Sequence, residues 1–186
     1  MRTCFLVLTV GLLARPLQAQ GEVFDVHLMG GLTKLVSWID SLDTQFDALI
    51  GHQKAKQAAR RMDRLASSLY RLCRSKDDLV MSLSSPIATD QEISEDGYRI
   101  QGELEEVHEQ FDKVGEMMIR RGSSPSEEAI RGSLNGKAIE VERLTQEFRR
   151  PGFDRSRAIA QAKQAATLCR KAQTEASSAA AHLESK

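Results

Sequence analysis

The sequence predicts an all-α fold, an up-and-down bundle of four to five long helices with coiled-coil-like seams. Aromatic residues make up 5% of the 186 residues and only four are proline, whereas a β-sandwich or barrel needs many strand formers and frequent turns. Good helix formers such as Ala, Leu, Glu, Arg and Gln dominate. Apolar residues also recur at alternating spacings of three and four, the period of an amphipathic helix. The length fits one domain, residues 20–186.

The first nineteen residues have the pattern of a secretory signal peptide. Arg2 gives a positive start, Cys4 to Leu13 is an apolar run, and Ala19 is a small residue at the predicted cleavage site. The run is far shorter than the ~20 residues of a membrane-spanning helix. The sequence therefore predicts an exported protein, periplasmic or extracellular; an uncleaved membrane anchor is the alternative.

Proline and glycine divide the remaining chain into five predicted helices, near residues 22–50, 53–83, 89–121, 125–149 and 154–184. Pro86, Pro125 and Pro151 stand between periodic stretches, as expected for a residue that lacks an amide donor. The seams before and after Gly51 are out of phase by one residue, which favours a break at Gly51-His52. The alternative is one continuous helix of ~90 Å.

The first two helices each carry a leucine-rich seam. In the first helix the seam residues are Leu28, Leu32, Leu35, Ile39, Leu42, Phe46 and Leu49. In the second they are Met62, Leu65, Leu69, Leu72, Leu79 and Leu83, with Lys76 as an interruption.

The third helix has the most regular seam. Its residues alternate spacings of four and three without a slip, as in a coiled coil: Ile93, Gly97, Ile100, Leu104, Val107, Phe111, Val114 and Met118. Thr89 followed by Glu92 predicts a capping box at its start. Gly97 within the seam is expected to let a neighbouring helix approach closely.

The last two helices are weaker. The fourth begins well at Pro125, but Gly132 and the turn-forming pair Asn135-Gly136 predict a break or a mobile point. The seam of the fifth is mainly alanine, which favours a helix but buries little area. We therefore expect the fifth helix to pack closely but weakly, and its Ser177–Ala181 end to fray or to await a partner.

Two cysteines, Cys73 and Cys169, remain after removal of the predicted signal peptide. In an oxidising compartment such a pair suggests a disulfide, worth up to ~4.7 kcal/mol for a loop of about a hundred residues. The alternative is two separate buried thiols, because cysteine packs like a small apolar residue.

Charge is balanced overall, with 26 basic and 26 acidic residues, so no basic excess points to nucleic acid. Along the chain, however, a basic helix from Lys54 to Lys76 lies between two acidic helices. Since short loops make consecutive helices neighbours, we expect the second helix to pack against both the first and the third. Alternatively, its basic stripe binds anionic lipid or another polyanion.

The sequence carries no motif for catalysis, a metal or a cofactor. The four histidines lack zinc-site spacing, and the Glu105–His108 pair of a di-iron bundle has no second copy. Phosphate loops, paired Cys-x-x-Cys and a nucleophile elbow are missing as well. We therefore expect a protein that is not an enzyme, with no cofactor and no metal.

These features favour an interaction or structural subunit of an envelope or exported assembly, acting through its surfaces. Candidate partner contacts are Trp38 and the turn residues Gly132, Asn135 and Gly136. We expect Trp38, beside Ile39, at the edge of the core; if exposed, it would be an interface anchor. An exposed part of a seam could accept a partner helix or a second copy of the chain. The alternative function is a lipid-binding amphipathic bundle, but the narrow apolar seams do not favour it.

The start of the predicted mature chain carries one resemblance. A chain that begins Val23-Phe24-Asp25 and passes directly into a long helix is similar to the minor-pilin subunits of conjugative type IV secretion machines. The likeness covers about thirty residues without a diagnostic motif, and those subunits are typically richer in asparagine, of which this chain has one. It implies a component of a type IV secretion system as a further alternative.

Overall fold

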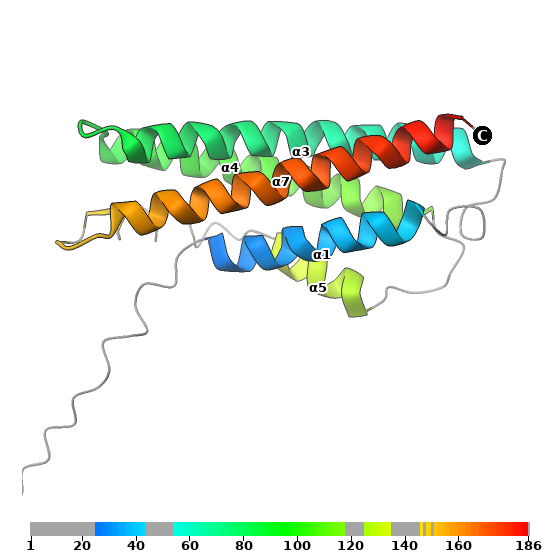
Figure 1. Ribbon diagram of the computed structural model, residues 1–186, viewed down its shortest axis with the longest axis horizontal. Helices are drawn as coiled ribbons and strands as arrows, with labels where there is room; N and C mark the ends of the chain where they lie inside the picture. The colour runs from blue at the N-terminus through cyan, green and yellow to red at the C-terminus, as the bar shows by residue number, and fades with distance from the viewer. Residues whose placement is uncertain are drawn as a thin grey trace, which may run out of the picture.

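The computed structural model describes residues 25–43, 54–117, 125–134, 146, 148, 149 and 151–185. Its helices are α1 (Asp25–Asp43), α3 (Ala55–Ser84), α4 (Asp90–Gly115), α5 (Pro125–Leu134) and α7 (Arg155–Glu184). They pack side by side, which confirms the predicted all-α bundle (Figure 1). The predicted signal peptide, the break at Gly51-His52 and the seam residues Phe46, Leu49 and Met118 lie outside the described residues.

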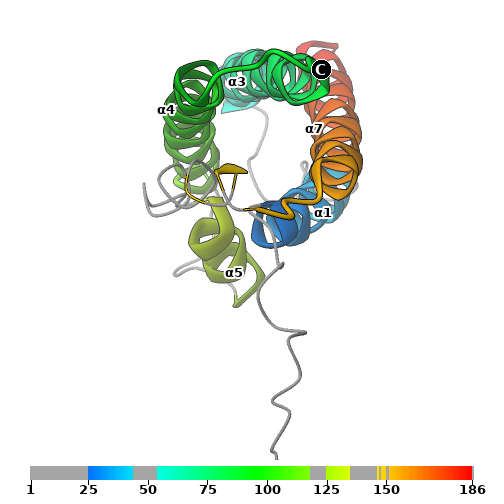
Figure 2. The ribbon, with the colours of Figure 1, turned by 90° about the vertical axis from the view of Figure 1, so that its left-hand side faces the viewer.

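The helices form a ring in the order α4, α3, α7, α1 and α5 when the bundle is seen from its end (Figure 2). The described helices alternate in direction along the chain: α1, α4 and α7 run one way, and α3 and α5 run the other way (Figure 1). Because α1 and α3 run in opposite directions, a single straight helix through both is excluded.

The predicted pairing of the first two helices needs correction. Among the described helices, α3 packs against α4, as predicted, and against α7, whereas α1 packs against α7 and α5. The acidic first helix is therefore not the neighbour of the basic second one. The reason is that α7 lies between them, and apolar burial outweighs exposed ion pairs, which contribute only ~0–1 kcal/mol each.

The alanine-rich helix α7 packs closely against its neighbours, as predicted. Its contact with α3 is the most extensive in the described bundle, and it contacts α1 as well. Small side chains allow this, because helix axes approach more closely where alanine lines the contact. The buried residues of α7 are Ala158, Ala162, Ala165, Ala166, Cys169, Ala172, Ala176, Ala179, Ala180 and Leu183.

Side-chain caps fix where two of the helices begin. The capping box of α4 is present: the Glu92 amide donates to Thr89 Oγ1 (3.2 Å) and the Thr89 amide donates to Glu92 Oε2 (2.8 Å). The Thr89 amide, and then the Thr89 hydroxyl, which also donates to Glu92 Oε2 (3.0 Å), lower the pKa of Glu92. At α7, Asp154 accepts from the Arg157 amide (2.9 Å). Gly152 has a φ of 86° in the preceding turn, a conformation that favours glycine.

The predicted seam residues of α3 and α4 form the centre of the core. Every seam residue from Ile93 to Val114 is buried, including Gly97. In α3 the leucines of the seam are buried, and so is Lys76, which the sequence marks as an interruption. At 1% exposure the ammonium group of Lys76 is buried together with its aliphatic stem, so the seam continues through this residue.

Candidate interaction surface

The interior of the described bundle leaves no seam open for a partner helix. The apolar residues of α1, α3, α4, α5 and α7 join one continuous buried cluster. In α1 the described seam residues from Leu28 to Leu42 are all within it. A partner would therefore have to bind a surface other than these seams.

Trp38 belongs to this core. Its side chain is 5% exposed, and its ring lies 4.7 Å from the ring of Phe111 on α4, at an angle of 57°. Its Nε1 donates to Glu127 Oε1 on α5 (3.2 Å). Trp38 is therefore not a surface anchor for a partner. It lies in the core, where it holds α1, α4 and α5 together.

Helix α5 is seated on α1 and α4 by a polar and a close contact. Arg131 pairs with Asp112 of α4, and its guanidinium lies 5.7 Å from the centre of the Phe111 ring. A Cβ added to Gly31 of α1 would come within 2.5 Å of Ser133 Cβ. Only glycine at position 31 allows α5 to approach α1 so closely.

The other predicted contact residues fall in and after α5. Gly132 is exposed, and a Cβ added there meets nothing within 4 Å. Asn135 and Gly136 lie outside the described residues. Gly132 remains compatible with a surface contact, but it stands alone among the described residues of this predicted group.

The two cysteines are free, buried thiols on facing helices. Cys169 Sγ of α7 donates to the Leu69 carbonyl of α3 (3.2 Å). A hydrogen bond with Cys73, together with burial, raises the pKa of Cys169 well above its usual range. The Cys169 thiol is therefore in its protonated form, beside Cys73.

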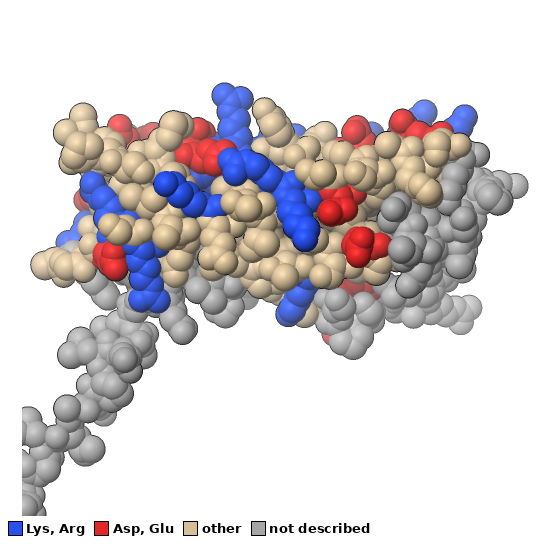
Figure 3. Space-filling model, in the orientation of Figure 1, with Lys and Arg blue, Asp and Glu red and all other residues tan. Residues whose placement is uncertain are grey.

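The basic helix is only partly neutralised by its neighbours. Arg71 Nε lies 3.0 Å from Glu103 Oε2 and Arg61 lies 3.5 Å from Glu116, both on α4. Within the part of the chain that the structure describes, Lys56, Arg60 and Arg74 take part in no ion pair. Opposite charges are interspersed on the face in Figure 3, so the separation along the sequence produces no single-sign patch there.

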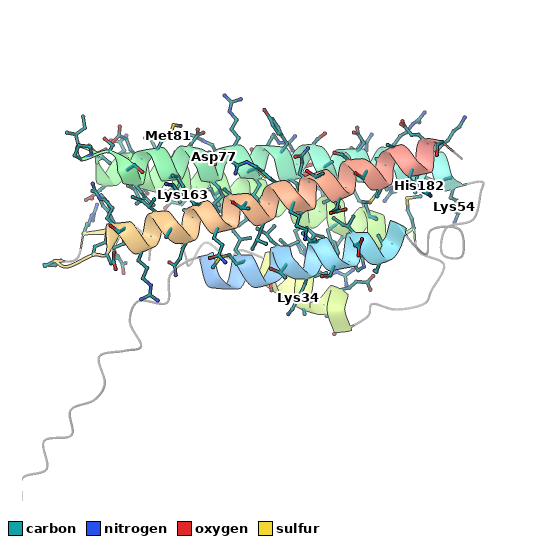
Figure 4. The ribbon with its side chains drawn as sticks, in the orientation of Figure 1. Lys34, Lys54, Asp77, Met81, Lys163 and His182 are labelled. Atoms are coloured by element: carbon teal, nitrogen blue, oxygen red, sulfur yellow. The ribbon has the colours of Figure 1, made fainter. Side chains whose placement is uncertain are left out.

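A second stripe runs along the outside of α3, opposite its core seam. Its eight residues follow one another at alternating spacings of four and three, and we call them the outer α3 stripe: Lys56, Arg60, Asp63, Ser67, Tyr70, Arg74, Asp77 and Met81. Tyr70 is 57% exposed and Met81 is 64% exposed. Figure 4 shows Met81 on the side of α3 away from α1, whereas Asp77 of the same stripe lies nearer to α7 and pairs with its Arg170.

Large exposed apolar side chains are scarce elsewhere. Among the described residues the others are Tyr98 of α4, 53% exposed, and Ile87 in the turn after α3, 85% exposed. Neither belongs to a stripe with unpaired cations. The outer α3 stripe is thus the described surface that combines apolar anchors with free positive charge, and the sequence carried its signal in the four-three spacing.

Searches for other kinds of site and for relatives gave no positive finding. Within the described residues, no group of three or more His, Cys, Asp and Glu could hold a metal ion. None of the described helices has a stretch apolar and long enough to span a bilayer. No protein-family model, no curated protein and no solved structure matches the chain.

Proposed function

We propose that this protein is an exported, non-enzymatic helical bundle that binds another protein along the outer α3 stripe. The proposal of export rests on the sequence of residues 1–19, with its positive start, apolar run and small residue at position 19. The proposal of binding rests on the stripe itself. Its key observation is that Tyr70 and Met81 are more than half exposed on the same face of α3 as Lys56, Arg60 and Arg74, while the described core seams are closed.

The residue types of the stripe suggest the chemistry of the partner. Tyrosine, methionine and arginine are enriched at protein interfaces, and a few such anchors usually supply most of the binding energy. Burying Tyr70 or Met81 completely would contribute about 1.5–3 kcal/mol each. Arg74 follows Tyr70 in the stripe and Arg60 lies ten residues before it, and both cations would favour acidic side chains. We therefore expect a partner helix or sheet that presents apolar residues next to Asp or Glu.

The experiment is a pull-down of the full chain from exporting cells under gentle conditions, with identification of the proteins that co-elute. The double variant Tyr70→Ala/Met81→Ala should reduce capture of the specific partner by at least tenfold, about 1.4 kcal/mol. The matched control is Tyr98→Ala/Ile87→Ala, which removes one tyrosine and one aliphatic residue of similar exposure outside the stripe. Equal capture by both double variants would refute the role of the stripe.

Two alternatives have distinct outcomes in the same material. Flotation with anionic phosphatidylglycerol vesicles at physiological salt would favour the lipid-binding hypothesis, because Lys56, Arg60 and Arg74 could also face lipid head groups. If the captured partners are pilus or secretion-channel subunits, the resemblance of residues 23 onward to minor pilins gains support. Capture of a tagged copy of the same chain would instead indicate self-association.

A further inference from the structure

We infer that Cys73 and Cys169 are a disulfide site, which links α3 covalently to α7 when a disulfide oxidant reaches the two thiols. The inference concerns the interior of the bundle and does not depend on the outer α3 stripe or on export. The free thiols in the structure are then the reduced form of the pair, and the disulfide is its oxidised form.

The first support is the position of the Cys169 sulfur. Its Sγ donates to the Leu69 carbonyl over 3.2 Å. In an α-helix that carbonyl also accepts the amide hydrogen of the residue four positions later, which is Cys73. The sulfur of Cys169 therefore contacts the backbone turn of α3 from Leu69 to Cys73.

The direction of the Cys73 side chain brings its sulfur to the same place. Side chains in a helix tilt toward the N-terminal turn, so the Cys73 sulfur lies over the turn that begins at Leu69. Both residues are buried. The hydrogen bond of Cys73 is also the largest cause of the raised pKa of Cys169, which agrees with thiols in contact.

The third support is the spacing of the two helices. The residues of α7 that surround Cys169 on its buried face are alanines, including Ala165, Ala166, Ala172 and Ala176. Alanine-lined contacts lie at the short end of the ~8–10 Å range of helix-axis distances. A disulfide needs two such close backbones, with Cα atoms ~5.5–6 Å apart, and the 3.2 Å contact between Cys169 Sγ and the Leu69 carbonyl shows that α3 and α7 are close at this level.

The reaction is thiol–disulfide exchange with a small disulfide such as oxidised glutathione. The Cys73 thiolate attacks one sulfur, releases one glutathione thiolate and forms a mixed disulfide. The Cys169 thiolate then attacks the Cys73 sulfur and releases the second glutathione. The two electrons lost by the cysteine pair and the two protons it releases end on two molecules of reduced glutathione.

The test uses the full chain with Cys4→Ser, so that only two cysteines remain. One sample is treated with oxidised glutathione in the folded state, and another is refolded from denaturant with the same reagent, which reaches both thiols before they are buried. After alkylation in denaturant, the refolded sample should show a mass lower by two hydrogens and no alkyl adduct. Its thermal midpoint should rise by about 10 °C and return to the starting value after reduction.

A register control distinguishes a built site from chance pairing. In Cys4→Ser/Cys169→Ala/Ala176→Cys the second cysteine is equally buried on α7, but it lies seven residues, about 10 Å, farther along the helix. After the same treatment this variant should form no intramolecular disulfide, so its two cysteines should be found alkylated or bound to glutathione. Two alkylated or two glutathione-bound cysteines in the refolded parent would overturn the inference, as would equal cross-linking of the control.

Discussion

Helices α3 and α7 have the same length, 30 residues, and pack against each other, but they are built from different residues. Helix α3 contributes leucines to the core and carries cations outside, whereas the buried face of α7 is almost entirely alanine. Large side chains fill the interior, and small ones determine how near two helices come. The two helices therefore stabilise one contact in different ways.

The difference also explains the order of the ring. An alanine face is narrow and close-fitting, so α7 can contact α3 on one flank and α1 on the other. A helix with bulky residues on both flanks would hold its neighbours farther apart. The alanine helix thus decides which helices are neighbours, and the leucine helix contributes large buried side chains to their contact.

The largest effect is expected from removing bulk on α3. Leu69→Ala should lower the free energy of unfolding by about 2–5 kcal/mol, because Leu69 is completely buried and its loss leaves a cavity. The same change in α7, Leu168→Ala, should cost clearly less, since Leu168 is only partly buried. Urea unfolding of both variants measures the difference. Equal losses would contradict the division of roles.

Adding bulk to α7 should be the next largest effect. Ala172→Leu places three extra carbon atoms where the side chain is fully buried, and overpacking of this kind costs about 1–3 kcal/mol. The control is Ala160→Leu on the exposed side of α7, which should change stability by less than about 0.5 kcal/mol. If Ala172→Leu is neutral, the contact between α3 and α7 is looser than the geometry indicates.

The same contrast shows how much of the fold could be predicted from the sequence. The seam from Ile93 to Val114 was predicted, and it is buried because an unbroken four-three spacing fits only one face of a helix. Lys76 does not interrupt the buried face of α3, because its whole side chain is buried, which the residue type alone does not predict. The neighbours of α1 were mispredicted from charge, because burial of small residues decides the pairing.

The candidate surface was harder to predict than the fold. The predicted contact Trp38 is buried against Phe111 and bonded to Glu127, which is 89 residues away in the chain, and sequence spacing does not indicate such a partner. Tyr70 and Met81 were not singled out, although their four-three spacing with Arg74 and Asp77 was present in the sequence. A second periodic stripe opposite a core seam is the signal to look for.

The pH dependence of stability tests how strongly the contact between α3 and α7 disfavours the charged thiolate form of Cys169. The hydrogen bond with Cys73, and then burial, raise the pKa of Cys169, while an unfolded thiol titrates near 8.5. The contribution of the protonated Cys169 thiol to the free energy of unfolding is therefore fully present below about pH 8.5, and it is lost progressively as the pH rises above that value. Under reducing conditions, stability should fall by up to about 1.4 kcal/mol per pH unit above that point.

The control for this pH dependence is Cys169→Ala, whose stability should change less between pH 8.5 and 9.5 because the thiol with the raised pKa has been removed. Urea unfolding in the presence of a phosphine reductant measures both proteins. Parallel pH profiles for the two proteins would mean that water or a cation reaches the thiol in the folded state.

The smallest effect is expected from the ion pair that joins the two helices at the surface. Arg170 of α7 pairs with Asp77 of α3, and this carboxylate raises the pKa of Arg170. Because both side chains are about half exposed, a double-mutant cycle of Arg170→Ala and Asp77→Ala should give a coupling of about 0.2–1 kcal/mol, reduced by 1 M salt. A coupling above about 2 kcal/mol would mean that charge, and not the alanine face, holds α7 against α3.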